Sequence, residues 1–110
     1  MRIEPTPFFV RMLKRLSKKY PSITADVRAL AQSIEENPIQ GTALRRGAYK
    51  IRLAIRSKNK GKSGGSRVIT CVRVKQDVVY LLDIYDKSDR ENILDEELDT
   101  LIDQIDALED

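Results

Sequence analysis

The sequence predicts an α+β fold, in which a small, mostly antiparallel twisted sheet carries an N-terminal helix pair and a C-terminal helix. Residues 49–56 and 67–75 alternate between apolar and polar side chains, with the two-residue period of a β-strand. Apolar side chains recur at three- and four-residue spacing, the period of amphipathic helices, in residues 7–20, 23–36 and 94–108. The 110 residues are enough for one core, so we expect one domain over residues 1–110, in the order β-α-α-β-β-β-α.

The chain begins with a strand and a helix. Arg2–Glu4 stands just before Pro5, which predicts a short edge strand with Ile3 facing inward. Thr6 before Pro7 is typical of a helix N-cap followed by proline in the first turn, and Pro21 ends this helix. A basic stripe beside its apolar stripe is either a solvated face or an extension of a binding surface. The stripe consists of Arg11, Lys14, Arg15 and Lys18.

A second amphipathic helix follows after a tight connection. It is expected to begin near Ser22–Thr24 and to stop at Asn37-Pro38. Pro38–Gly47 then reads as a loop with turn glycines and one buried anchor, Leu44.

The stretch from Lys50 to Lys75 predicts a β-hairpin with a long loop rich in glycine and lysine. In its first arm Ile51 and Leu53 alternate with cationic side chains. In the second arm one face holds Val68, Thr70, Val72 and Val74, and the other holds Arg67, Ile69, Cys71, Arg73 and Lys75. From Arg45 to Lys75 the chain carries eleven Lys or Arg and no Asp or Glu. We therefore expect one face of the hairpin to pack in the core and the other to present an anion-binding surface.

Two further elements complete the chain. Gln76-Asp77 predicts a tight connection into a third strand, Val78–Tyr85, whose unbroken apolar run predicts burial on both faces and a place in the middle of the sheet. The last helix has an apolar stripe from Leu94 to Leu108 and acidic side chains over the rest. These acids either keep a surface helix solvated or lie near the basic face and shield it.

The charge is divided along the chain. Residues 1–75 hold 18 basic and 4 acidic side chains, whereas residues 76–110 hold 2 basic and 13 acidic ones. The strong positive charge of residues 1–75 predicts a polyanionic partner such as nucleic acid.

Composition excludes several classes of protein and site. The chain has no histidine and one cysteine, Cys71, which leaves no usual zinc ligands, so we expect neither a metal nor a cofactor. Cys71 is expected to be a packing residue in a reducing cytoplasm. No apolar run is long enough to span a membrane and no secretion signal is visible, so we expect a cytoplasmic protein that contacts no membrane.

The sequence Gly61-Lys62-Ser63 superficially matches a phosphate-binding P-loop. That motif needs a glycine five residues earlier, where this chain has Arg56, and a helix afterwards, where Gly64-Gly65 and a strand follow. Nucleotide binding by this route is rejected. The glycines either bring backbone N–H groups close to phosphate or form a loop that lysines keep soluble.

Without histidine, catalysis is left to Lys, Arg, Tyr or a lone Asp. An RNA phosphodiester is cleaved by its own 2′-hydroxyl when a base removes the proton and cations stabilise the crowded phosphate. Arginine matches phosphate with a planar fork, and a lysine among other cations loses its proton more readily. Lys50, Arg52 and Arg67 fit this scheme if the hairpin arms pair side by side.

Several motifs together resemble the RelE/ParE toxin superfamily, most closely its HigB-like branch. They are Lys50-Ile51-Arg52, the loop Lys60–Ile69 with its GK-x-GG-x-R pattern, Tyr80-Leu81-Leu82 and Ile84–Lys87. The resemblance covers nearly the whole chain. It implies a toxin of a type II toxin–antitoxin system, a metal-independent endoribonuclease (mRNA interferase) that cuts mRNA in the ribosomal A site and so inhibits translation.

The resemblance also implies roles for residues and partners. Carried over by position, Lys50, Arg52, Arg67, Tyr85 and Lys87 are the catalytic candidates. The RNA-binding candidates are Arg56, Lys58, Lys60, Lys62 and Arg73. The expected partners are a cognate antitoxin of the helix-turn-helix type, the ribosome with its mRNA and ribosomal RNA, and operator DNA only through the antitoxin complex.

One difference from the superfamily keeps two alternatives open. Many active members carry a Tyr or His near the C-terminus for proton transfer, and the chain after Tyr85 has neither, which leaves Tyr85 or Lys87 for that role. The alternatives are a ParE-like toxin that inhibits DNA gyrase without cutting RNA, and an inactive relative that binds RNA or antitoxin.

Overall fold

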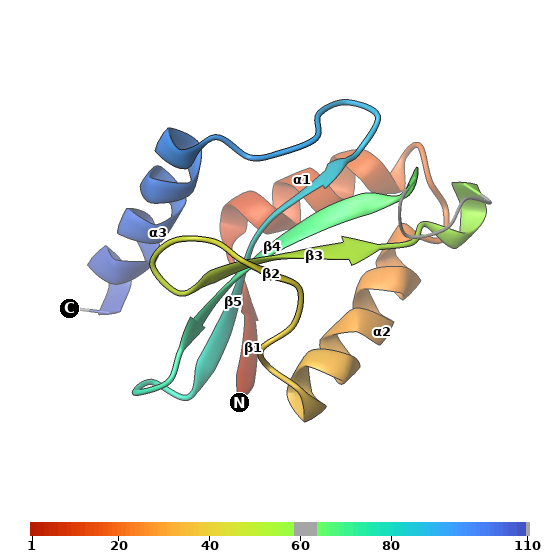
Figure 1. Ribbon diagram of the computed structural model, residues 1–110. Coiled ribbons are helices and arrows are strands. Elements are labelled where there is room, and N and C mark those ends of the chain that lie inside the picture. Colours follow the sequence, from red (N-terminus) through yellow and green to blue (C-terminus); the bar gives the residue numbers. More distant parts are fainter. Residues whose placement is uncertain (59–63, 110) are drawn as a thin grey trace.

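The architecture is a mixed β-sheet with helices on both faces. The computed structural model describes residues 1–58 and 64–109. Its elements, in chain order, are β1 (Arg2–Pro5), α1 (Pro7–Ser17), α2 (Ile23–Glu36), β2 (Thr42–Ala43), β3 (Ala48–Leu53), the 3₁₀ turn η1 (Arg56–Lys58), β4 (Ser66–Arg73), β5 (Val78–Asp86) and α3 (Asp95–Glu109) (Figure 1). The described strands form one sheet in the order β1-β5-β4-β3-β2, with β1 parallel to β5 and the other neighbours antiparallel. The predicted α+β class is confirmed.

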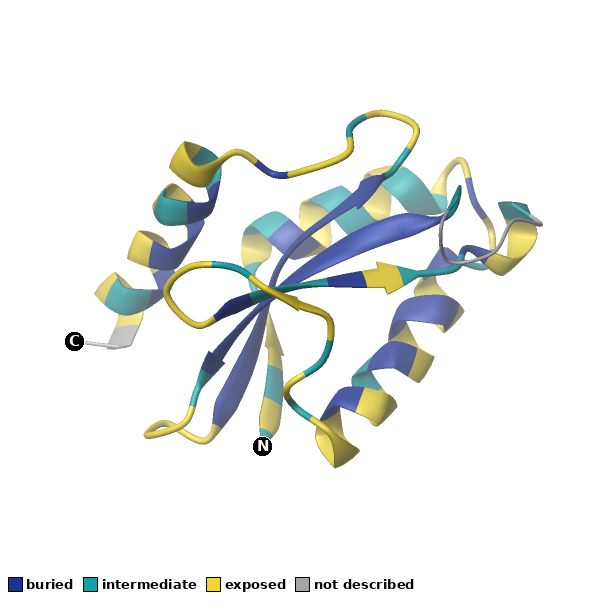
Figure 2. Cartoon of the chain, in the orientation of Figure 1, coloured by how far each residue is buried: buried dark blue, intermediate teal, exposed yellow. Residues whose placement is uncertain are grey.

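The sheet has a core on each face. One core lies between the sheet and helices α1 and α2, and includes Phe9, Ile34 and Val68. The other lies between the sheet and α3, and includes Ile69 and Ile102. Strands β4 and β5 are therefore buried on both faces along most of their length (Figure 2). The second face of the hairpin was expected to be free, but α3 covers part of it.

Three expectations about the elements were wrong. The strand in the middle of the sheet is β4, because β1 adds to the outer side of β5 in parallel. The predicted loop after α2 contains the short strand β2, which pairs with β3. Leu94 and Leu108 are exposed; α3 begins after Leu94, and the residue before it, Ile93, is the one that packs in the core.

The start of α1 is as predicted. The Thr6 hydroxyl accepts a hydrogen bond from the backbone N–H of Phe9, 3.2 Å away, which satisfies one of the free donors of the first turn. The same hydroxyl donates to the carbonyl of Leu81 at 3.1 Å, so this cap also fixes α1 to β5. Ile3 faces the core and Cys71 is buried, as expected. None of the helices formed by the described residues is long and apolar enough to cross a membrane.

A β-bulge in β5 decides which way its last residues point. Thr70 of β4 pairs with Leu81, but Ile69 pairs with Asp83, so Leu82 is an extra residue on β5. Strict alternation would place Tyr85 on the same face as Leu81, toward α1 and α2. The bulge reverses this, and Tyr85 packs with the core on the α3 face.

Candidate functional site

The bulge brings three of the predicted residues into one row across the sheet. Arg52 of β3 pairs with Arg67 of β4, and Arg67 pairs with Tyr85 of β5. Paired residues of antiparallel strands point to the same face, so these side chains are neighbours. The next row, on the same face, places Lys50 opposite Ile69. The structure thus groups Lys50, Arg52, Arg67 and Tyr85, and we call these four residues the cationic row.

The members of the cationic row differ in exposure. Arg52 is exposed, whereas Arg67 is 2% exposed and Tyr85 is 6% exposed. One guanidinium nitrogen of Arg67, Nη1, donates to the carbonyl of Ser66 at 3.1 Å. Arg67 is therefore a buried cation, although the sequence suggested a surface residue.

Residues 88–94, which connect β5 to α3, lie over the cationic row, and we call them the covering segment. The Cζ atom of Arg90 lies 4.4 Å from the centre of the Tyr85 ring. Arg90 also donates to Asp83 at 2.7 Å and to Glu97 at 2.8 Å, so it links β5 to α3. Lys50 Nζ donates to the side-chain oxygen of Asn92 at 2.6 Å. The covering segment thus contacts the cationic row at two places, Lys50 and Tyr85.

Sequence reasoning missed Arg90 as a site residue. A signal was present, because Arg90 and Lys87 are the two basic residues in the strongly acidic part after residue 75. A lone arginine among acids is more often a structural partner than a site residue, and here it forms two ion pairs as well as the contact with Tyr85.

Burial sets the proton affinities of the two ionisable groups under the covering segment. Burial raises the pKa of Tyr85, and the nearby Arg90 only partly offsets it. The Tyr85 hydroxyl is buried near Ile93, and no described residue meets hydrogen-bonding geometry with it. Tyr85 therefore remains a neutral phenol at physiological pH, a form that donates a proton. Burial likewise raises the pKa of Asp83 to about 6, against the attraction of Arg90.

Asp86 and Lys58 belong to a structural cluster and not to the row. The buried Asp86 carboxylate accepts hydrogen bonds from the Tyr20 hydroxyl, from Lys58 Nζ at 2.7 Å, and from the backbone and hydroxyl of Ser88. Burial alone would raise the pKa of Asp86, but the hydrogen bonds from Lys58, Tyr20 and Ser88 outweigh it and lower that pKa well below its usual range. Lys58 also lies over the Tyr20 ring, with Nζ 5.4 Å from its centre. This lysine is held inside the fold.

Other predicted RNA-binding residues also have acidic partners. Arg56 pairs with the buried Asp26 at 2.6 Å, and Arg73 pairs with Asp106 at 3.1 Å. Lys60 and Lys62 lie outside the described residues. Lys87 is half-buried beside the row, and its backbone N–H donates to the carbonyl of Gly65 at 3.0 Å.

The acidic helix α3 lies against the basic residues around the start of β3 and the end of β4. Arg45 pairs with Asp95 and Asp99, and Arg46 pairs with acids on three successive turns of the helix. Of the two readings of these acids, the structure favours shielding of a basic surface. The anion-binding part of the hairpin is consequently narrower than its charge suggested.

Gly65 has a steric role in the loop motif. A Cβ atom on Gly65 would lie 2.3 Å from the carbonyl oxygen of Leu53, far inside contact distance. Glycine is therefore required where the chain returns to begin β4 close to the end of β3. The structure explains this glycine by close packing of backbone against backbone.

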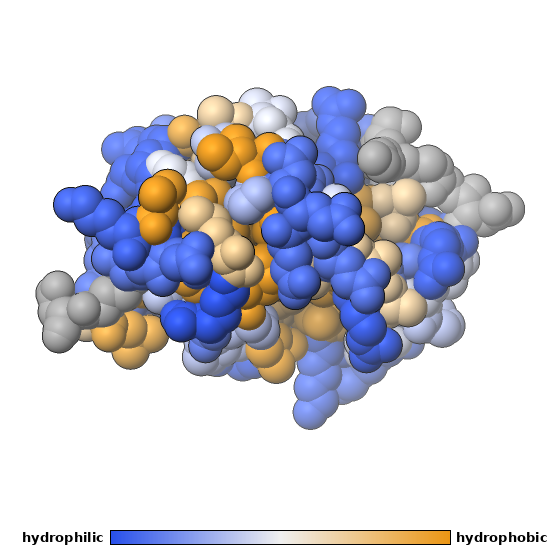
Figure 3. Space-filling model, turned by 90° about the horizontal axis from the view of Figure 1, so that it is seen from below, coloured by the Kyte–Doolittle hydropathy of each residue, from blue (hydrophilic) through white to orange (hydrophobic). Residues whose placement is uncertain are grey.

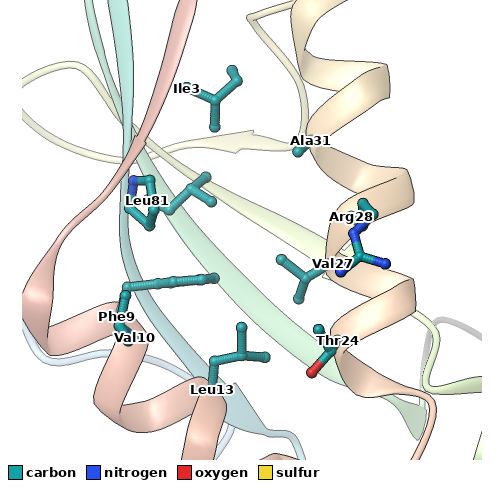
Figure 4. Close-up of a pocket in the computed structure, with 10 residues that line it drawn as sticks. Ile3, Phe9, Val10, Leu13, Thr24, Val27, Arg28, Ala31 and Leu81 are labelled. Carbon is teal, nitrogen blue, oxygen red and sulfur yellow. The ribbon is translucent and has the colours of Figure 1, made fainter.

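A second concave site lacks catalytic groups. A groove of about 320 Å³ lies between α1, α2 and the β1–β5 pair, and Phe9, Val27 and Leu81 are among its mostly apolar lining residues (Figure 4). Hydrophobic side chains also reach the surface near the middle of the face in Figure 3, between hydrophilic ones. Within residues 1–58 and 64–109, no cluster of His, Cys, Asp and Glu side chains has the form of a metal site.

A comparison with protein-family models identifies the family. The model described as the RelE toxin of the RelE/RelB toxin–antitoxin system matches residues 1–107. The chain belongs to the RelE toxin family. The structure resembles that of a double mutant of E. coli toxin RelE in the free state, with a TM-score of 0.59 and 20% sequence identity, over 94% of this chain and 96% of that one.

At this identity the match to the E. coli structure shows a shared fold. No curated protein sequence gives a significant match. The predicted membership in the RelE/ParE superfamily is confirmed for RelE, and the narrower HigB-like branch stays a prediction.

Proposed function

We propose that this RelE-family toxin is a metal-independent endoribonuclease that cuts mRNA on the ribosome in the bacterial cytoplasm, with residues 1–110 acting as one domain. The observation that carries this proposal is the cationic row, which gathers two guanidinium groups, an amine and a neutral phenol on one face of the sheet. Phosphate recognition and proton transfer require these groups.

The proposed reaction is transfer of the phosphoryl group to the ribose 2′-oxygen. The 2′-oxygen forms a bond to phosphorus, the bond to the 5′-oxygen breaks, and the products are a 2′,3′-cyclic phosphate and a free 5′-hydroxyl. Arg52 and Arg67 would stabilise the charge of the crowded phosphate. Tyr85, which its raised pKa keeps protonated before the reaction, would give its proton to the leaving 5′-oxygen. Lys50 is the candidate that accepts the 2′-hydroxyl proton, with Lys87 beside the row as a further proton donor.

Substrate access requires a change in the covering segment. Arg67 and Tyr85 are nearly inaccessible, and Arg90 stands over the Tyr85 ring. We propose that RNA displaces residues 88–94, so that phosphate replaces the carboxylates of Asp83 and Glu97 as partner of Arg90 and replaces the Asn92 amide as partner of Lys50. Arg90 would then also contact RNA.

The proposed partners follow from the family. A RelE toxin is paired with an antitoxin, and we propose a helix-turn-helix antitoxin that also links this chain to operator DNA. The ribosome with its mRNA and ribosomal RNA is the proposed target.

The burial of Arg67 and Tyr85 favours a second candidate function, inhibition of DNA gyrase by binding. Arg67 and Tyr85 are covered, and Arg56, Lys58 and Arg73 are neutralised. A toxin that inhibits gyrase by binding, as ParE-like relatives do, would need none of these residues exposed.

One experiment separates the two candidates. Purified protein is added to a cell-free translation reaction with and without ribosomes, and mRNA 5′ ends are mapped. New ends inside the reading frame that depend on ribosomes support the nuclease. Intact mRNA together with loss of supercoiling in a gyrase assay would replace it with the second candidate.

A further inference from the structure

The cations of α1 and of the turn after it differ from most of those in and before the hairpin, because no described carboxylate lies within salt-bridge distance of them, although Asp86 and Asp89 attract Lys19 from farther away. Between Glu4 and Asp26 the sequence contains no acidic residue. The exposed cations in this stretch are Arg11, Lys14, Arg15, Lys18 and Lys19. Within the described ranges, 1–58 and 64–109, no salt bridge reaches any of these five side chains.

The hairpin shows the opposite arrangement. Five cations of the hairpin and of the loop before it are bonded to carboxylates, namely Arg45, Arg46, Arg56, Lys58 and Arg73. An arginine that is already paired offers less charge to an incoming phosphate, since binding must first break the pair. Among the described residues, five exposed cations without a salt bridge thus lie close together within residues 11–19, whereas Arg28, Arg52 and Lys75 are spread along the chain.

Arg11, Lys14 and Arg15 lie on the outer face of α1, and Lys18 and Lys19 follow in the turn after the helix. Four of them, from Arg11 to Lys18, follow the helical period on the side opposite Phe9, whose ring is buried in the core. Arg11 lies over the Phe8 ring at 5.7 Å and Lys19 over the Tyr20 ring at 5.3 Å, so two of the five are oriented by aromatic neighbours. We call these five residues the α1 basic face.

The α1 basic face continues into the candidate site. A cavity of about 370 Å³ lies between the second half of α1 and the end of β5. Arg15 lines it from α1, Lys19 from the turn after the helix, and Tyr85 and Arg90 from the other side. Three carboxylates also line it, of which Asp83 and Asp86 are already paired with Arg90 and Lys58, and Asp89 is the third. A chain of phosphates along α1 would thus reach the covering segment and the cationic row.

We propose that the α1 basic face binds the sugar-phosphate backbone of RNA and leads it across this cavity toward Tyr85. This inference rests on the proposed function, because the RNA is the kind of molecule that the cationic row would cleave. RNA fits better than an acidic protein, since the core of a protein interface is apolar and this face consists of cations. Released counterions would supply the affinity.

The test is RNA binding at several salt concentrations. The probe is a fluorescent, unstructured RNA of about 20 nucleotides with 2′-O-methyl riboses, which binds but cannot be cleaved. Wild type is compared with the triple variant Lys14→Gln/Arg15→Gln/Lys18→Gln. The matched control, Arg2→Gln/Arg45→Gln/Lys75→Gln, removes the same charge from exposed positions elsewhere. Thermal unfolding of all three proteins verifies that they remain folded.

We expect the α1 variant to bind RNA about tenfold more weakly and its salt slope to fall by about two, while the control stays close to wild type. Equal weakening in both variants would overturn the proposal, because net charge alone would then explain binding. Unchanged RNA binding would also overturn it. The binding experiment does not depend on RNA cleavage. A failure of the proposed nuclease function would appear separately, as the absence of new mRNA ends in the cell-free translation reaction.

Discussion

The guanidinium of Arg90 lies 4.4 Å from the centre of the Tyr85 ring, while its nitrogens bond to Asp83 and Glu97. One side chain thus joins the end of β5, the covering segment and the start of α3. The phenol that we propose as proton donor is held under this cation, so the stability of the cover and the chemistry of the site are linked.

Removing Arg90 should destabilise the protein through Asp83. Asp83 is 1% exposed, and in Arg90→Ala its carboxylate stays buried without its cation, at a cost of about 2–3 kcal/mol in free energy of unfolding. In Arg90→Ala/Asp83→Asn the buried charge is gone, so we expect much of that loss to be recovered. Urea unfolding of the two single variants and the double variant at pH 7 measures this. Strictly additive effects would show that the pair is not coupled.

Asp83 should also give an unusual pH dependence. Its folded pKa of about 6 lies above the value of about 3.9 for an unfolded chain, so the folded state holds the proton more tightly. The contribution of Asp83 to stability therefore falls as the pH rises from about 4 to 6. Asp83→Asn should remove this fall, which urea unfolding across that range would reveal. A variant whose pH profile is parallel to that of wild type would refute the assignment.

Asp86 should give a pH dependence of stability opposite to that of Asp83, because its pKa is lowered in the folded protein. Its pKa is lowered by the bonds from Lys58, Tyr20 and Ser88, so its contribution is complete above the unfolded pKa near 4 and is lost as the pH falls further. Asp86→Asn should cost about 3 kcal/mol at pH 7 and show a smaller loss of stability in acid. The exposed neighbour Asp89 provides the control, since Asp89→Asn should change neither quantity.

Substitutions at Arg52 and Arg67 should separate activity from stability. Arg52 is exposed, so Arg52→Ala should lower RNA cleavage while changing stability by less than about 0.5 kcal/mol. Arg67 is buried, and Arg67→Ala should lower both, since it leaves a cavity and unpaired groups. Cleavage rates and urea midpoints measured together test this. If Arg52→Ala cleaves at the wild-type rate, Arg52 has no part in the site.

Gly65→Ala should destabilise the protein strongly, since a Cβ atom would lie 2.3 Å from the Leu53 carbonyl oxygen and backbone would have to shift. We expect a loss of at least about 2 kcal/mol in free energy of unfolding. A fully stable variant would mean that the loop motif needs this glycine for some reason other than close packing.

Local patterns in the sequence predicted the local structure well. The Thr6-Pro7 pair marked the start of α1, and the alternation in Lys50–Lys75 marked the hairpin faces, because both signals depend on neighbouring residues. The position of β5 could not be predicted, since it depends on the parallel pairing of β1 with β5, in which Arg2 lies opposite Val78, far away in the sequence. Its apolar run contains no alternation that would reveal the bulge at Leu82.

The candidate site was only partly visible in the sequence. Cationic positions on the strands were found, but their partners come from other parts of the chain. Lys58 meets Asp86, and Arg73 meets Asp106 on the last helix, so residues that read as RNA-binding proved to be paired. Charge along a sequence does not show which cations the fold neutralises.

The central claim is that the cationic row cleaves RNA with Tyr85 as proton donor, and Tyr85→Phe tests it most directly. The substitution removes only a buried hydroxyl whose polar neighbour, the backbone of Ile93, lies outside normal hydrogen-bond geometry, so stability should change little. Rates of ribosome-dependent mRNA cleavage, from 5′-end mapping in cell-free translation, are compared for wild type and this variant. The account predicts new ends with wild type and a rate about 100-fold lower with Tyr85→Phe. Equal rates, in a variant of equal stability, would contradict it.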